Sequence, residues 1–356
     1  MPTNRIVKIK NKLTENKLDA FLITFPPHIR YVSGFAGTSC ICFITKRNKF
    51  LLIDERYSVQ AKNQAHGWKI LVAEDSLFEG LKKYNLIRSD WKVGVDGNNI
   101  VLTQYKSLKK LFPETHFYPK VGFIEEFTSI KDKTEIAKIK KAVGITDRVF
   151  EKILEYIKPG MYESEIAVEI TYLHRKYGAA GDAFKPIVTS GVNGAMPHAS
   201  TSEKKIKNGE MVTLDFGCTV DGYNSDLTRT VFVGKPKSFA LKLYKIVAEA
   251  QKHAIGAAKP GISARELDAV ARNLIRGAGY GDYFTHSLGH GIGLQVHEPP
   301  RVSAKNKVVL QEGNVITIEP GIYIPGFGGV RIEDDVVIRN GDAEILNKAI
   351  KEPIVI

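Results

Sequence analysis

The stretch from Val212 to Thr230, Val-Thr-Leu-Asp-Phe-Gly-Cys-Thr-Val-Asp-Gly-Tyr-Asn-Ser-Asp-Leu-Thr-Arg-Thr, has the pattern of two β-strands joined by a tight turn at Asp221-Gly222. With that turn, Asp215 faces Thr228, and Asp226 is the diagonal neighbour of Asp215 on the same face, roughly 7–8 Å away between Cα atoms. An unpaired carboxylate in a half-buried strand is costly, so such groups are normally paired or bind a metal. Taken alone, the hairpin fits a solvent-exposed edge with ordinary acids equally well.

The sequence around this hairpin is duplicated. Lys158-Pro-Gly matches Lys259-Pro-Gly, and Pro197-His198 matches Val296-His297. Ile206-Lys-Asn-Gly-Glu-Met-Val-Thr-Leu-Asp-Phe-Gly matches Leu310-Gln-Glu-Gly-Asn-Val-Ile-Thr-Ile-Glu-Pro-Gly. A unit made of a helix and then a hairpin therefore occurs twice. The repeat predicts two such units packed about a pseudo-twofold axis, and it makes Glu319 the equivalent of Asp215.

The second hairpin supplies further acids. In Val330-Arg-Ile-Glu-Asp-Asp-Val-Val337, we align Glu333 with Asp226, so pseudo-symmetry predicts four carboxylates at one place. Two divalent cations about 3.5–4 Å apart would neutralise them and form a known hydrolytic arrangement. His290, in Gly-His-Gly-Ile-Gly, is the candidate nitrogen ligand, because its glycines let backbone approach closely. That segment lacks the full spacing and the preceding strand of a phosphate loop.

The chain has 356 residues, of which 43% are hydrophobic, and this length predicts two domains. Up to about residue 118, helical and strand-like patterns alternate, as expected for an α/β domain with a mixed sheet. Thr128 to Thr134 is polar and suits a linker, and a long helix follows from Thr134 to Lys158. We place the domains at 1–128 and 129–356.

Composition narrows the functional classes. The net charge is +12, but the basic residues are spread along the chain, which argues against a nucleic-acid partner. No secretory leader or run of roughly 18–20 apolar residues is present, so we expect a cytoplasmic protein without a membrane partner. The three cysteines, Cys40, Cys42 and Cys218, cannot complete a zinc site by themselves and are expected to be buried thiols.

In this order, seven residues resemble the ligand and histidine set of the pita-bread metallopeptidases: His198, Asp215, Asp226, His290, His297, Glu319 and Glu333. The set is most similar to that of the Xaa-Pro peptidases, aminopeptidase P and prolidase. Tyr31 to Thr38 and Leu52 to Tyr57 resemble their smaller N-terminal domain. The resemblance implies an α/β creatinase-type N-terminal domain and an α+β pita-bread C-terminal domain with pseudo-twofold internal duplication.

The resemblance also implies a metal-ligand set. Asp215 would bind one divalent ion and Asp226 would bridge both. His290 and Glu319 would bind the second ion, and Glu333 would bridge. Glu319 would also move a proton from water to the leaving nitrogen. Mn²⁺ is the expected metal, with Co²⁺, Zn²⁺ and Fe²⁺ as alternatives.

Further residues match the family's substrate-handling positions. His198, His286 and His297 would hold the substrate and stabilise the transition state. Arg331 would orient a metal-binding carboxylate. Arg301, which follows His297-Glu-Pro-Pro, would contact the substrate carboxylate.

The implied activity is hydrolysis of the Xaa-Pro bond at the N-terminus of short proline-containing peptides. We favour the aminopeptidase over the dipeptidase (prolidase), because no feature of the sequence limits the substrate to two residues. The alternatives are a peptide-binding pita-bread protein without catalysis, a creatinase and a methionine aminopeptidase. The family resemblance further implies a homodimer or a larger homo-oligomer.

Overall fold

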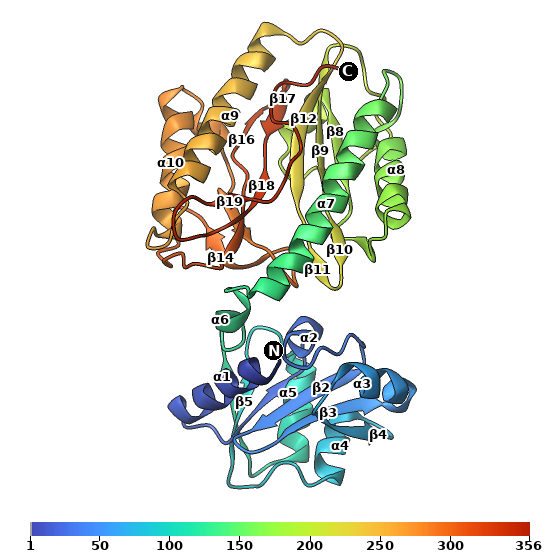
Figure 1. Ribbon diagram of the computed structural model, residues 1–356, viewed down its shortest axis with the longest axis vertical. Coiled ribbons are helices and arrows are strands. Elements are labelled where there is room, and N and C mark those ends of the chain that lie inside the picture. Colours follow the sequence, from blue (N-terminus) through green and yellow to red (C-terminus); the bar gives the residue numbers. More distant parts are fainter. Residues whose placement is uncertain (1) are drawn as a thin grey trace. The chain divides into compact units, whose positions relative to one another are not determined.

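The computed structural model describes residues 2–356. The chain forms two compact units, divided between Thr128 and Ser129 (Figure 1). None of the described helices is long and apolar enough to cross a membrane. All three cysteines are buried and form no disulfide, as the sequence predicts.

The first unit is built on a six-stranded sheet with the strand order β4-β3-β2-β1-β5-β6. Its strands are β1 (Ala20–Ile23), β2 (Cys40–Thr45), β3 (Lys49–Asp54), β4 (Lys69–Ala73), β5 (Lys92–Asp96) and β6 (His116–Lys120). Its helices are α1 (Pro2–Glu15), α2 (Pro26–Ser33), η1 (Glu55–Tyr57), α3 (Ser58–Gln64), α4 (Leu77–Lys83), α5 (Leu102–Leu111) and α6 (Glu125–Thr128). The β1–β2 and β2–β3 pairs are antiparallel and the other pairs are parallel, which confirms the predicted mixed α/β sheet.

The second unit begins with the long helix α7 (Lys133–Tyr156). The Asp132 side chain accepts hydrogen bonds from the backbone amides of Thr134 and Glu135, and the Glu135 carboxylate accepts one from the amide of Asp132. This reciprocal capping fixes the start of the helix within one residue of the predicted position. Gly160, with φ 89°, lies in the turn that follows the helix.

Two similar halves make up the rest of this unit. Its remaining helices are α8 (Glu163–Lys176), η2 (Gly191–Ala195), α9 (Ser238–Ala257), α10 (Ala264–Gly277) and η3 (Gly281–Tyr283). Its strands are β7 (Gly181–Asp182), β8 (Ile187–Ser190), β9 (Glu210–Phe216), β10 (Cys218–Val220), β11 (Tyr223–Asn224), β12 (Leu227–Val233), β13 (Gly289–Gly291), β14 (Glu298–Val302), β15 (Val315–Ile318), β16 (Gly321–Ile324), β17 (Gly328–Arg331), β18 (Asp334–Val337) and β19 (Glu344–Ile345). Helices α7 and α8 share one apolar core with β8, β9 and β12, while α9 and α10 share another with β15 to β18 (Figure 1).

The first hairpin has the register that the sequence predicts. Asp221 and Gly222 have φ values of 49° and 79°, as a two-residue turn with both central residues left-handed requires. Asp215 pairs with Thr228. The hairpin is divided into β9–β12 and β10–β11 at Gly217, where a Cβ atom would lie 1.8 Å from the Ser225 carbonyl oxygen. Only glycine permits this close approach.

The second hairpin differs from the first in one respect. Ile318 pairs with Asp334 and Gly321 pairs with Arg331, so the same register makes Glu319 face Glu333 directly. Glu333 therefore occupies the position equivalent to Thr228, two residues from the position of Asp226 with which we aligned it. A shift of two residues keeps a side chain on the same face of a strand, so the carboxylate still points into the same cluster.

Candidate metal centre

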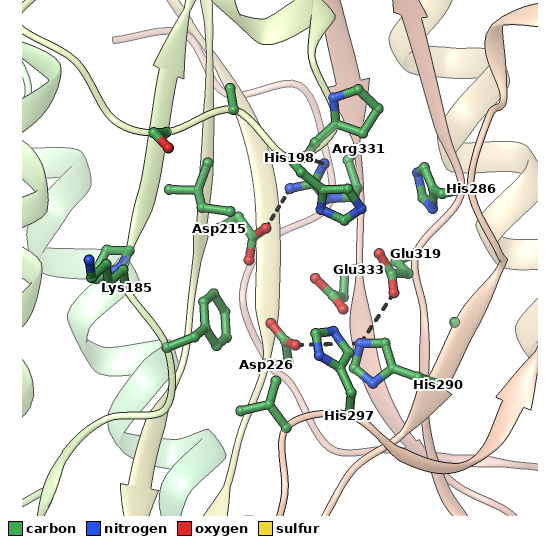
Figure 2. A pocket seen from close by; sticks show the side chains of 18 of the residues that line it. Lys185, His198, Asp215, Asp226, His286, His290, His297, Glu319, Arg331 and Glu333 are labelled. Carbon is green, nitrogen blue, oxygen red and sulfur yellow. Dashed lines mark hydrogen bonds and ion pairs between the residues drawn. The ribbon is translucent and has the colours of Figure 1, made fainter.

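A cavity of about 1160 Å³ lies in the second unit. All ten residues that the sequence analysis selects line it: His198, Asp215, Asp226, His286, His290, His297, Arg301, Glu319, Arg331 and Glu333. Figure 2 shows the carboxylates and histidines of this set pointing toward one another across the cavity. The two hairpins deliver the acids from opposite halves of the unit, so the duplication produces one shared site.

The acids lie where strands begin or end. Asp215 is near the end of β9, and Asp226 directly precedes β12. Glu319 directly follows β15, and Glu333 directly precedes β18. Strand ends from both hairpins therefore meet at the site. Each acid is fixed in place by the end of a strand, and its carboxylate faces the cavity.

His290 is oriented toward the acids by the backbone. Its Nδ1 lies 3.1 Å from the Gly291 carbonyl oxygen, to which an Nδ1–H can donate. Its Nε2 lies 3.4 Å from Glu319 Oε1 and 3.8 Å from Asp226 Oδ2. Burial, with a contribution from His297, lowers the pKa of His290 to about 3. A neutral imidazole therefore presents its Nε2 lone pair to carboxylates, which is the arrangement of a metal ligand.

The carboxylates repel one another. Burial, followed by the charges of Glu333 and Asp215, raises the pKa of Asp226 well above its ordinary value. Burial and the charges of Glu319 and Asp215 likewise raise the pKa of Glu333. The pKa of Glu319 rises to about 8, mainly through burial. Such shifts mark a site that lacks enough positive charge of its own.

These donors fit divalent cations. Asp226, His290 and Glu333 each offer one ligand atom, and these atoms lie within 4.8 Å of one another. Asp226 Oδ1 is buried and has no hydrogen-bond partner within residues 2–356. Over that same range, Arg331 is the one lysine or arginine whose side chain donates to the four clustered carboxylates, and it binds Asp215. Oxygen and imidazole donors with this excess of negative charge suit Mn²⁺, Zn²⁺ and related ions.

Arg331 holds one side of the site. Its Nη2 donates to Asp215 Oδ2 at 2.5 Å, and its Nε donates to Thr228 Oγ1 at 3.0 Å. Thr228 in turn donates to Glu333 Oε2 at 2.6 Å. One guanidinium therefore fixes a carboxylate from each hairpin, one directly and one through Thr228.

Tyr323 extends this network to His286. Its hydroxyl accepts a hydrogen bond from Arg331 Nη1 at 2.8 Å and lies 2.8 Å from His286 Nε2. His286 Nδ1 lies 2.8 Å from the Ser287 carbonyl oxygen. Burial and the neighbouring Arg331 lower the pKa of His286 to about 3, so the ring is neutral and accepts from the tyrosine. The register with Asp215 could have identified Thr228, but no pattern in the sequence identifies Tyr323.

Three predicted residues line the cavity with exposed side chains. The rings of His297 and His290 are 4.2 Å apart and nearly perpendicular. Burial and His198 lower the pKa of His297, so its neutral form prevails at neutral pH. Arg301 Nε donates to Ser287 Oγ at 2.8 Å, and its two terminal nitrogens have no partner among residues 2–356. His198 lies across the cavity, beside Arg331 (Figure 2).

Comparison with known proteins decides the family. Residues 137–340 match the model of metallopeptidase family M24, and residues 5–129 match the creatinase/prolidase N-terminal domain. The chain belongs to metallopeptidase family M24. It is thus a hydrolase of the metallopeptidase class, with a creatinase-type domain before its catalytic domain, as the sequence predicts.

Relatives of this M24 chain match along nearly all of its length. The Xaa-Pro dipeptidase of Pyrococcus furiosus is 39% identical, over 98% of this chain and 99% of that protein. An uncharacterized peptidase of Bacillus subtilis is 37% identical, over 99% and 100%. Among solved structures, an Xaa-Pro dipeptidase from Bacillus anthracis has a TM-score of 0.96 with 38% identity and full coverage of both chains. An X-Pro aminopeptidase from Thermotoga maritima has a TM-score of 0.88 with 36% identity, covering 96% of this chain and 98% of that one.

Proposed function

We propose that this M24 peptidase hydrolyses the bond between an N-terminal residue and proline in short peptides. The observation that carries the proposal is the convergence of His290 with four carboxylates at the wall of a cavity that also exposes His198 and His297. The Xaa-Pro dipeptidases and the X-Pro aminopeptidase among its relatives support the choice of proline.

Two divalent ions are the proposed cofactors, held by five residues: Asp215, Asp226, His290, Glu319 and Glu333. When bound, such ions lower the pKa of water to near neutrality and polarise a carbonyl oxygen. Mn²⁺ is our first choice of metal. Asp226 and Glu333 are proposed ligands because both are buried and each feels the charges of other acids in the cluster, which bound cations would neutralise.

Residues of the chain carry out proton transfer, stabilise the substrate oxygen and position other side chains. Glu319 accepts a proton and returns it to the leaving proline nitrogen. His198 and His297 are exposed to the cavity and donate to the substrate carbonyl oxygen as it gains negative charge. Both ring nitrogens of His286 already face partners, so His286 acts by positioning Tyr323 and Arg331.

The structure bears on whether the enzyme accepts only dipeptides or also longer peptides. The cavity, about 1160 Å³, is larger than the usual range for small-ligand sites, about 300–1,000 Å³, which favours an aminopeptidase that accepts more than two residues. Arg301 favours the alternative, a dipeptidase, since its free terminal nitrogens can bind the carboxylate of an Xaa-Pro dipeptide.

The test uses three matched substrates: an Xaa-Pro dipeptide, the same sequence extended by one residue, and a dipeptide with alanine in place of proline. We expect chelation to abolish hydrolysis of the proline peptides and Mn²⁺ to restore it. Hydrolysis of the extended peptide identifies an aminopeptidase, and hydrolysis of the dipeptide alone identifies a dipeptidase. Equal and measurable rates for the alanine and proline dipeptides, or full activity after exhaustive metal removal, would refute the proposal.

We also propose that the enzyme is a cytoplasmic homodimer or larger homo-oligomer, as in the family it resembles. Light scattering on the purified full-length chain gives its mass in solution. A mass equal to that of one chain, 39.5 kDa, at working concentration would contradict this part of the proposal.

A further inference from the structure

A second cluster of metal-binding side chains lies in the first unit and is separate from the peptidase site. His28 on α2, Asp96 at the end of β5 and Glu125 at the start of α6 each offer one ligand atom, and these atoms lie within 4.8 Å of one another. The three residues are 1%, 2% and 6% exposed. Three chain segments far apart in sequence thus bring two carboxylates and an imidazole into one buried place.

The cluster contains donor atoms without partners. Asp96 Oδ2 lies 2.6 Å from His28 Nδ1, and an Nδ1–H donated to that oxygen leaves a lone pair on Nε2. Within residues 2–356, both His28 Nε2 and Glu125 Oε2 are buried without a hydrogen-bond partner. A histidine oriented by a carboxylate, with its other nitrogen free, is the usual arrangement of a metal-binding imidazole.

The remaining carboxylate oxygens are held by amides. Asn98 Nδ2 donates to Glu125 Oε1 at 2.7 Å, and Asn99 Nδ2 donates to Asp96 Oδ1 at 3.0 Å. Both asparagines lie in the turn after β5 and carry no charge. These contacts orient the carboxylates as outer-shell partners do in metal sites, without supplying a counter-charge.

The charge of the cluster is unbalanced. No lysine or arginine among the described residues forms an ion pair with Asp96 or Glu125, and His28 is the one basic side chain that contacts either acid. Two carboxyl groups therefore share one imidazole as their nearest basic partner. A buried water molecule could satisfy the unpaired atoms, but it would supply no positive charge.

We infer that His28 and Glu125 bind a divalent transition-metal ion such as Zn²⁺, at a structural site in the first unit that is independent of the proposed peptidase function. The proposed ligand atoms are His28 Nε2 and Glu125 Oε2, the two buried atoms of the cluster without a partner among the described residues, and water molecules would complete the coordination. Asp96 lies against the opposite ring nitrogen, Nδ1, and orients the imidazole instead of binding the ion itself. The ion would tie α2 to α6, which ends this unit, and Asp96 connects this site to the end of β5.

The test compares Zn²⁺ content after dialysis, measured by mass spectrometry of the full-length protein. Glu125→Gln keeps the size of the side chain and the acceptor for Asn98 but removes the charge. The matched control is Asp182→Asn, because His174 Nδ1 lies 2.6 Å from Asp182 Oδ1 in a similar but half-buried pair that has Thr171 in place of a second acid. Each variant is made with the peptidase site intact and also with Glu333→Gln.

We expect Glu125→Gln to contain one Zn²⁺ fewer than its parent in both backgrounds, and Asp182→Asn to contain the same number as its parent. Equal Zn²⁺ content in Glu125→Gln and its parent would overturn the inference. If instead the peptidase proposal failed, Glu333→Gln would contain as much Zn²⁺ as the chain with an intact peptidase site, whichever residue stands at position 125, so the two failures are distinguishable.

A second measurement guards against a folding defect. In chelator, Glu125→Gln should melt at the same temperature as the parent or higher, because one of two buried acids is gone. Added Zn²⁺ should then raise the melting temperature of the parent more than that of Glu125→Gln or His28→Gln. If Glu125→Gln melts lower in chelator and Zn²⁺ raises the melting temperatures of parent and variants equally, the cluster is a hydrogen-bond network and the inference is wrong.

Discussion

Removing metal and then raising the pH from about 6.5 to about 8.5 should destabilise the protein. Burial raises the pKa of Glu319 from 4.5 to about 8 in the folded chain. The folded state therefore holds a proton that the unfolded state has already released, and stability falls as the pH rises through this window. At about pH 6.5 the folded carboxyl is almost fully protonated, whereas at about pH 8.5 it is mostly ionised.

The size of the effect follows from the same shift. While the folded carboxyl stays protonated and the unfolded one is ionised, each pH unit lowers the free energy of unfolding by about 1.4 kcal/mol. Between about pH 6.5 and the folded pKa of about 8 this covers roughly 1.5 pH units. Glu319 alone should therefore cost about 2 kcal/mol. Asp226 and Glu333 shift in the same direction and add to the loss.

The histidines set the lower limit of the window. Burial lowers the pKa values of His286 and His290 from 6.5 to about 3, so their contribution to stability is complete above pH 6.5 and is lost as the pH falls below it. Above about pH 6.5 these two histidines are neutral in both the folded and the unfolded state, so they do not oppose the alkaline loss that the carboxyls cause. Bound cations would remove the loss on the alkaline side, because they stabilise the ionised carboxylates.

The assay is denaturant unfolding at several pH values, with chelator or with saturating Mn²⁺. Glu319→Gln should reduce the alkaline loss of the metal-free protein by about 2 kcal/mol, while Glu203→Gln, at an exposed position of the same unit, should not change it. The reasoning is refuted if metal-free wild-type protein is equally stable at both pH values, or if Glu319→Gln shows the same alkaline loss as wild type.

Three substitutions test other parts of the site. Tyr323→Phe removes the hydroxyl between Arg331 and His286 and should lower kcat about tenfold with little change in KM; an unchanged kcat would contradict a positioning role. Arg331→Met leaves Asp215 without its guanidinium partner and should weaken metal binding roughly 10–100-fold in a metal titration, so unchanged affinity would count against it. Arg301→Gln should raise KM for an Xaa-Pro dipeptide about tenfold or more and leave an extended peptide less affected; equal effects on both would exclude carboxylate binding.

Local sequence rules predicted the first hairpin in detail. The Asp221-Gly222 turn fixes the register because both residues adopt positive φ, and that register places Asp215 opposite Thr228. The internal repeat then identified Glu319, because equivalent positions of a duplicated unit meet at its pseudo-symmetry axis. The family of the chain followed from the order of these residues.

The second hairpin shows where such reasoning stops. Aligning acid with acid matched Glu333 to Asp226, but the strands pair so that Glu333 faces Glu319. The reason is that a longer connection joins the two strands here, so the turn between them does not set the register from sequence alone.

Side chains that act through long-range contacts were also missed. Tyr323 becomes important only because Arg331 and His286 reach it from separate segments. The sequence also did not predict the cluster of His28, Asp96 and Glu125, because its members are distant in sequence and follow no regular spacing. Such sites depend on tertiary packing, which residue patterns do not record.

The central claim is that two related hairpins direct oxygen and nitrogen donors at a shared pair of divalent ions. Anomalous diffraction from a crystal grown with Mn²⁺ tests this most directly. We predict two peaks about 3.5–4 Å apart, enclosed by Asp215, Asp226, His290, Glu319 and Glu333. A map with no peak among these five residues, at saturating Mn²⁺, would contradict the account.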